Sequence, residues 1–150
     1  MSVIAPELVE LDLDAYASTK EEAIERLVTL VGASGRATDV AQLRADVGSR
    51  EDLMPTGIEG GIGIPHARSA AVVEATVAFG RTTKGIDFGA ADGPATLVFL
   101  IVAPAGGGNE HMRVLSALAR KLIHQSFKDS LKQAPDADTV VDVFVKEVGI

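Results

Sequence analysis

The sequence contains no cysteine among its 150 residues. Disulfide bonds, zinc sites built on thiolates and cysteine nucleophiles are therefore excluded, and a cytoplasmic location is the default expectation. Tryptophan is also absent, and aromatic residues make up only 4% of the chain. The core must consequently consist of aliphatic side chains, and the aromatic platforms on which many proteins stack nucleic-acid bases are missing.

Long hydrophobic runs are missing as well. No apolar stretch approaches the roughly 18 residues that a membrane-spanning helix requires. The opening segment MSVIAPELVELDLDAY lacks the basic and apolar regions of a secretion signal. Positive charge is scarce, since the formal net charge is −7 at pH 7. We therefore expect neither binding to nucleic acid nor direct insertion into a membrane.

The periodicity of apolar residues predicts the fold class. A length of 150 residues suits one domain, and we expect residues 1–150 to form it. Helices are expected over residues 18–35, 38–51, 109–123, 126–134 and 136–148, and strands over residues 7–15, 62–64, 74–83 and 95–104. Because helices and strands are interspersed, the chain is predicted to be α/β, with a mixed β-sheet sandwiched between helices.

Two helix ends carry boundary signals. Ser18 and Glu21 have the spacing of a capping box, which predicts the start of the first helix. The second helix is expected to begin after Thr38 or Asp39 and to end near Gly48.

The segment GIGIPHARSAA, residues 61–71, is the most specific feature of the chain. Pro65 fixes its own φ and biases Ile64 toward an extended conformation. We therefore expect a short strand over residues 62–64 that ends abruptly and presents His66 in a loop. The surrounding glycines leave room for a ligand to approach the backbone.

Two further polar residues, His111 and Arg50, are candidates for a site, whereas the third histidine, His124, is not. His111 lies in the first turn of the helix expected at 109–123, where free N–H groups and the helix dipole favour phosphate and a neutral imidazole. Arg50 lies near a helix end, where it either complements the helix dipole or supplies a fixed cation for phosphate. His124 lies among polar residues and is expected to be an ordinary surface histidine.

Several catalytic motifs are absent. The sequence has no GxxxxGK[ST] loop, no protein-kinase signature and no HExxH, and Ser69 does not lie in a GxSxG motif. The three histidines do not have metal-ligand spacing, so a zinc-binding domain is an alternative and not the main hypothesis. We expect no cofactor and no metal.

Two stretches carry a resemblance to a known family. They are REDLMPTGIEGGIGIPHA, residues 50–67, and NEHMRVLSALARKL, residues 109–122. The chain resembles the enzyme IIA domain of the bacterial phosphoenolpyruvate-dependent sugar phosphotransferase system, of the fructose–mannitol class (type 2). The likeness covers nearly the whole chain, including the opening segment IAPELVELDLD. The family fold is a mixed sheet flanked by helices on both sides.

The resemblance also implies a function and partners. His66 would accept a phosphoryl group from the phosphohistidine of the carrier HPr and pass it to a cysteine of an enzyme IIB. His111 would help to hold the phosphoryl group, and Arg50 corresponds to the active-site arginine of the family. The thiol of enzyme IIB and the membrane domain, enzyme IIC, must lie on other chains or on another part of a longer chain, because this sequence has neither a cysteine nor an apolar span.

Two positions depart from the family pattern, and the resemblance leaves two branches open. Glu59 stands where glycine is common, and a positive φ there would cost a non-glycine residue about 1–2 kcal/mol. Gly63 replaces the usual alanine. The main hypothesis is a relay in fructose-type sugar uptake. The alternative is the nitrogen-regulatory branch, whose members are phosphorylated on histidine but act by binding target proteins.

Overall fold

Helices and strands are interspersed along the chain, as expected for the α/β class. The computed structural model describes residues 2–149, except for the side chains of Glu110 and His111. In chain order the elements are the 3-10 helix η1 (Pro6–Leu8), β1 (Val9–Glu10), the 3-10 helix η2 (Leu13–Ala15), α1 (Lys20–Ala33), α2 (Val40–Leu53), β2 (Gly57–Ile58), β3 (Ile62–Gly63), β4 (His66–Ser69), β5 (Thr76–Ile86), β6 (Ala95–Pro104), α3 (Glu110–Leu122), α4 (Gln125–Gln133) and α5 (Ala137–Val148). No helix in this described part is both long and apolar enough to span a membrane.

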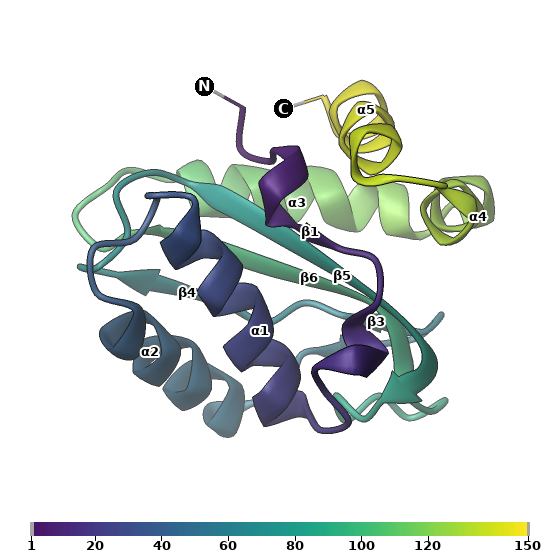
Figure 1. Ribbon diagram of the computed structural model, residues 1–150, viewed down its shortest axis with the longest axis horizontal. Coiled ribbons are helices and arrows are strands. Elements are labelled where there is room, and N and C mark those ends of the chain that lie inside the picture. Colours follow the sequence, from purple (N-terminus) through teal and green to yellow (C-terminus); the bar gives the residue numbers. More distant parts are fainter. Residues whose placement is uncertain (1, 150) are drawn as a thin grey trace.

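A mixed six-stranded sheet forms the centre of the molecule. The strand order is β1-β5-β6-β3-β2, and β4 also pairs with β6. β5 and β6 are antiparallel, whereas β1 runs parallel to β5, and both β3 and β4 run parallel to β6. Figure 1 shows α1 and α2 on one side of this sheet and α3, α4 and α5 on the other. The predicted fold class, a sheet between two helical layers, is therefore confirmed.

β6 supplies both hydrophobic cores. Successive side chains of a strand point to opposite faces of the sheet. The core under α1 and α2 accordingly takes Val98, Leu100 and Val102 from β6, and the core under α3–α5 takes Leu97, Phe99 and Ile101. Apart from Thr96, this strand is apolar, because helices cover both of its faces.

Two of the predicted helix boundaries shift, and one is confirmed. The capping box of α1 is formed by Thr19 and Glu22, one residue later than predicted, with the Glu22 N–H donating to Thr19 Oγ1 at 3.2 Å. Asp39 caps α2 as expected by accepting from the Gln42 N–H at 3.0 Å. The prediction that α2 ends near Gly48 is wrong, because the helix continues to Leu53. Its buried face extends from Val47 to Glu51, one turn later, so packing offsets the helix penalty of glycine.

The first predicted strand is largely replaced by 3-10 turns. Of the segment 7–15, only Val9–Glu10 pairs with β5. η1 begins at Pro6, which has no N–H to donate to a strand. η2 contains Asp14, whose carboxylate accepts hydrogen bonds from Thr82 and Thr83 on β5. The polar residue Asp14 in this segment therefore binds a neighbouring strand.

Candidate functional site

His66 is the first residue of β4. Ile62 of β3 lies opposite Leu97, and His66 lies opposite Ile101, so β3 and β4 follow β6 in the same register. The strand is interrupted at Ile64 and Pro65, since proline cannot donate to the ladder. The Pro65 carbonyl still accepts from the Ile101 N–H at 3.0 Å. The expectation that His66 lies in a loop is therefore wrong: the chain leaves the strand for two residues and His66 resumes it.

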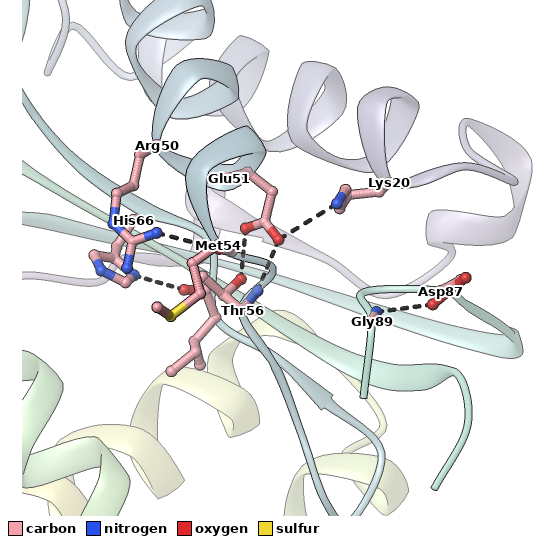
Figure 2. A network of polar contacts seen from close by, with 9 residues as sticks. Lys20, Arg50, Glu51, Met54, Thr56, His66, Asp87 and Gly89 are labelled. Atoms are coloured by element: carbon pink, nitrogen blue, oxygen red, sulfur yellow. Dashed lines mark hydrogen bonds and ion pairs between the residues drawn. The ribbon is translucent and has the colours of Figure 1, made fainter. Parts of the chain in front are cut away.

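One hydrogen bond sets the chemistry of the His66 ring. Its Nδ1 lies 2.8 Å from the carbonyl oxygen of Ile64 (Figure 2). A carbonyl oxygen can only accept, so Nδ1 must carry the proton. In the neutral ring Nε2 then holds the free lone pair. The half-buried imidazole is thus oriented by its own backbone and keeps one nitrogen available as a nucleophile.

Arg50 approaches His66 from the last turn of α2. Its Nη1 donates to the Met54 carbonyl oxygen at 3.2 Å (Figure 2). This carbonyl follows directly after the helix, so the guanidinium satisfies one of the acceptors that a helix end leaves unpaired. The dipole-complementing role considered for Arg50 therefore has a partner in the structure. It does not exclude a second role, because Arg50 also lines the cavity at His66.

A single open cavity brings the two residues together. It has a volume of about 490 Å³, and α2, β4 and the chain after β6 surround it. The lining residues are Asp46, Ser49, Arg50, His66, Ala67, Arg68, Ser69, Ala70 and Ala105. The charged side chains among these lining residues are two arginines and one aspartate.

Arg68 is a cavity residue that the sequence analysis missed. Residues two apart in a strand face the same side, so Arg68 projects from the same face of β4 as His66. Its Nη2 donates to the Gly108 carbonyl oxygen at 2.7 Å. This bond ties β4 to the glycine-rich connection before α3. The HARS sequence could have indicated it, since an arginine two residues after a strand histidine shares its face.

His111 lies in the first turn of α3, as predicted, but its side chain lies outside the described part of the structure. The start of α3 follows the glycine-rich connection that Arg68 holds. The α3 layer covers the face of the sheet to which Ile101, the partner of His66, contributes its side chain. The role of His111 stays a prediction.

His124 lies away from the cavity. It occupies the N-cap position of α4, is exposed, and is not among the cavity-lining residues. Among the side chains that the structure describes, no group of three or more His, Cys, Asp or Glu residues could hold a metal ion.

The two departures from the family pattern have different structural settings. Among the described residues, no non-glycine residue has a positive φ, so Glu59 carries no such strain. Gly60 and Gly61 take the positive values instead, at 97° and 78°. Gly63 packs against the ring of Phe88, and a Cβ atom built there would lie 2.8–3.1 Å from three ring carbons. The glycine at this position therefore makes room for an aromatic ring.

Comparison with known proteins identifies the family. Residues 2–147 match the family model "Phosphoenolpyruvate-dependent sugar phosphotransferase system, EIIA 2". The chain is 43% identical over 149 residues to the PTS system fructose-specific EIIA component of Haloferax volcanii, covering 99% of this chain and 96% of that protein. Other curated relatives are longer, among them a fructose-specific EIIABC component, of which the chain spans 21%.

Solved structures agree with this assignment. The nitrogen regulatory protein IIA-Ntr from Neisseria meningitidis is 32% identical with a TM-score of 0.84, covering 94% of this chain and 95% of that one. The enzyme IIA of the Escherichia coli mannitol system, solved in complex with its phosphorylated enzyme IIB, is 26% identical with a TM-score of 0.79, covering 95% and 96%. The chain therefore belongs to the EIIA type 2 family of the phosphoenolpyruvate-dependent sugar phosphotransferase system.

Proposed function

We propose that Nε2 of His66 accepts a phosphoryl group from the phosphohistidine of an HPr-type carrier and passes it to a cysteine of an enzyme IIB. The observation that carries this proposal is the 2.8 Å contact between His66 Nδ1 and the Ile64 carbonyl oxygen. It leaves Nε2 as the nitrogen with a free lone pair. A positioned nucleophile is the main requirement of phosphoryl transfer, because the reaction depends on alignment and charge stabilisation.

The exchange between two histidines needs no base. The Nε2 lone pair forms the new P–N bond while the P–N bond to the carrier's imidazole breaks, and that electron pair stays with the carrier's ring. The proton on Nδ1 of His66 remains in place throughout. As the ring gains positive charge, the Ile64 carbonyl accepts a charge-assisted hydrogen bond, which is shorter and stronger than a neutral one. Transfer to a cysteine thiolate of enzyme IIB then returns His66 to its neutral form.

The positive groups of the cavity support the same role. Arg50 and Arg68 line the cavity that contains His66. A guanidinium presents several N–H donors in a plane, which suits the oxygens of a transferring phosphoryl group. We assign Arg50 and His111 to the stabilisation of charge in the transition state, with His111 resting on its sequence position.

The relatives support an inference about the partners and the sugar. The Haloferax volcanii relative is named as fructose-specific, and the Escherichia coli mannitol homologue is solved in complex with phosphorylated enzyme IIB. We infer that this chain serves fructose-type uptake in the cytoplasm, with the enzyme IIB cysteine and the membrane enzyme IIC outside residues 1–150.

His66→Ala tests the proposal directly. We expect the variant to fold normally and to gain no phosphoryl mass on incubation with phosphoenolpyruvate, enzyme I and HPr, whereas the wild type gains one acid-labile phosphoryl group. Intact-mass measurement at neutral and acidic pH provides the comparison. A His66→Ala protein that is still labelled stoichiometrically would show that another residue is the acceptor.

A second candidate function is regulation by target binding. It is favoured by the similarity to the nitrogen regulatory protein, which has a TM-score of 0.84. The two functions share the phosphohistidine and differ in what receives the phosphoryl group. Incubating the phosphorylated protein with fructose-type enzyme IIB distinguishes them, because only the transport function predicts rapid loss of the phosphoryl group to the IIB cysteine.

A further inference from the structure

Glu51 is a buried carboxylate next to the site. Its side chain is 2% exposed, and it is the one carboxylate among the buried polar residues of the described chain. Burying a carboxylate costs several kcal/mol unless charged or hydrogen-bonding partners surround it. Arg50, its neighbour in α2, lines the His66 cavity, whereas Glu51 points into the interior (Figure 2). Such a costly group requires a structural explanation.

Glu51 binds Thr56 through both of its carboxylate oxygens. The Thr56 N–H donates to Oε2 at 2.8 Å, and the Thr56 hydroxyl donates to Oε1 at 2.6 Å. Lys20 of α1 lies 3.5 Å from Oε2 and balances the charge. A carboxylate is the side-chain group that offers two acceptor oxygens and no donor, so it suits two donors presented by one residue.

From Thr56 a series of hydrogen bonds continues to His66. The Thr56 carbonyl accepts from the Ile64 N–H at 3.2 Å. The Ile64 carbonyl accepts from His66 Nδ1 at 2.8 Å. Three consecutive contacts therefore connect the Glu51 carboxylate to the imidazole, and Figure 2 shows the first and last of them.

We propose that Glu51 is a positioning residue that holds His66 in the tautomer and orientation needed for phosphoryl transfer. Its effect on catalysis rests on the proposed function, whereas its effect on the ring does not. The consecutive hydrogen bonds lie on different peptide units, so Glu51 acts by fixing positions and not by polarising one continuous chain. It anchors Thr56, Thr56 anchors the strand break at Ile64, and the Ile64 carbonyl orients the ring.

The segment between α2 and β2 shows why an anchor is needed. Leu53, the last residue of α2, is exposed, as are Met54 and Pro55, whereas Thr56 is buried. Proline and the end of a helix both leave the backbone without regular hydrogen bonds. Glu51 holds this segment from the helix side, while the Gly57 N–H donates to the Phe88 carbonyl at 2.9 Å on the sheet side.

Four variants test the proposal. Glu51→Ala removes both contacts to Thr56, and Thr56→Val removes one of them with the backbone unchanged. Glu51→Gln is the conservative variant, because its amide oxygen can accept from the Thr56 N–H while its NH2 donates to the hydroxyl. Asp52→Asn, an exposed neighbour in the same helix, is the matched control for charge.

Two measurements are made on each folded variant. Nitrogen-15 NMR of the His66 ring reports which nitrogen carries the proton and requires no phosphoryl donor. Rapid-quench transfer from phospho-HPr reports the rate. We expect Glu51→Ala and Thr56→Val to populate the Nε2–H tautomer and to slow transfer, for Glu51→Ala by about 10- to 100-fold, as displaced catalytic groups do. Glu51→Gln should lie closer to the wild type, and Asp52→Asn should match it.

The outcomes separate this proposal from the proposed function. If Glu51→Ala does not fold, Thr56→Val provides the same two measurements with a smaller expected change. A wild-type tautomer in the folded variants overturns the proposal whatever the rate, and so does a wild-type rate alongside a changed tautomer. If the wild-type protein itself accepts no phosphoryl group, the proposed function fails, and the tautomer alone decides whether Glu51 positions the ring.

Discussion

The guanidinium of Arg50 contacts the end of a helix and also lines a cavity. At the helix end, the Met54 carbonyl accepts from Nη1 at 3.2 Å. The cavity is the one at His66. Because a guanidinium has five N–H donors, it can hold the helix end with one and still offer others to a phosphoryl group. The two roles that the sequence left open for this arginine are therefore compatible.

Replacing Arg50 should slow transfer without abolishing it. Removing one preorganised donor to a developing charge typically costs on the order of 10²–10³ in rate. We expect Arg50→Ala and His111→Ala each to fall in this range, because the carrier and β4 still position His66. Rapid-quench phosphorylation by phospho-HPr measures the effect.

His124→Ala is the control for these variants, since His124 is exposed and lies outside the cavity. It should transfer at the wild-type rate. If His111→Ala matches it in both phosphorylation and transfer to enzyme IIB, His111 is only a helix-start residue, and a site with two histidines is wrong.

Residue-level prediction succeeded for the strand break, because the conformation of proline sets it. Pro65 predicted the interruption between β3 and β4, whereas the loop expected at His66 is the start of β4. Arg68 was missed because its importance depends on the contact with Gly108, 40 residues away in sequence. Glu51 was missed for a similar reason: nothing in a helical REDL segment says which carboxylate is buried until α1 packs on α2.

In β3, the packing around Gly63 leaves no room for a larger side chain. Gly63 does not need a positive φ, so its backbone tolerates alanine. A Cβ atom there would nevertheless lie 2.8–3.1 Å from the Phe88 ring, which is fully buried. We expect Gly63→Ala to lower the free energy of unfolding by about 1–3 kcal/mol, as overpacking does. Urea denaturation measures the change.

Gly48→Ala is the matched control for this substitution. No described atom lies within 4 Å of a Cβ atom built on Gly48, which is in the interior of α2. Alanine is favoured over glycine in a helix by about 1 kcal/mol, so this variant should be more stable than the wild type. A Gly63→Ala protein that is equally stabilised would mean that Phe88 moves aside at little cost.

The contact between η2 and β5 should make stability depend on pH. Hydrogen bonds from the Thr82 hydroxyl and from the N–H and hydroxyl of Thr83 hold the pKa of the Asp14 carboxyl well below its usual 3.8. Since the folded pKa is the lower one, Asp14 stabilises the fold above about pH 4, and the contribution is lost as the pH falls below that value.

Asp14→Asn tests this dependence. The variant should be less stable than the wild type at pH 7, and the difference should shrink as the pH falls from 5 toward 2. Thermal unfolding at a series of pH values measures it. Asp12→Asn, an exposed neighbour, is the control and should follow the wild-type profile. A constant difference between Asp14→Asn and the wild type across this range would contradict the assignment.

At the scale of the whole molecule, the two hydrophobic cores share one strand. Phe99 of β6 packs with Phe79 on the α3–α5 side, with ring centroids 5.2 Å apart. Leu100, the next residue, belongs to the core on the α1–α2 side. Because adjacent residues of β6 support opposite layers, neither layer can lose its support without disturbing the other, and we expect one cooperative unfolding transition.

Phe99→Ala and Leu100→Ala test this coupling. Each removes a fully buried side chain, and we expect losses of about 3–5 and 2–5 kcal/mol respectively. In both variants, unfolding in urea is followed by far-ultraviolet and by near-ultraviolet circular dichroism. The two signals should give the same midpoint. Separate midpoints would show that one helical layer unfolds alone.

The overall class was predictable because the pattern repeats along the chain. Five amphipathic helical segments and the apolar run 95–104 indicated a sheet between two helical layers. The short strands β2 and β4 were not predicted, and β1 was predicted as a longer strand over residues 7–15, because two to four residues are too few to show a period. Their positions depend on pairing with β5, β3 and β6, which only the folded chain brings together.

The common register of β3 and β4 limits which insertions and deletions this protein can tolerate. Ile62 and His66 both lie opposite residues 35 positions later in β6, namely Leu97 and Ile101. Deleting or inserting a single residue between them would turn His66 to the opposite face of the sheet, because side chains alternate with a period of two. The four-residue spacing between Ile62 and His66 is therefore fixed by the strand register. This constraint acts on the number of residues between Ile62 and His66, and it is separate from the packing of Gly63 against Phe88.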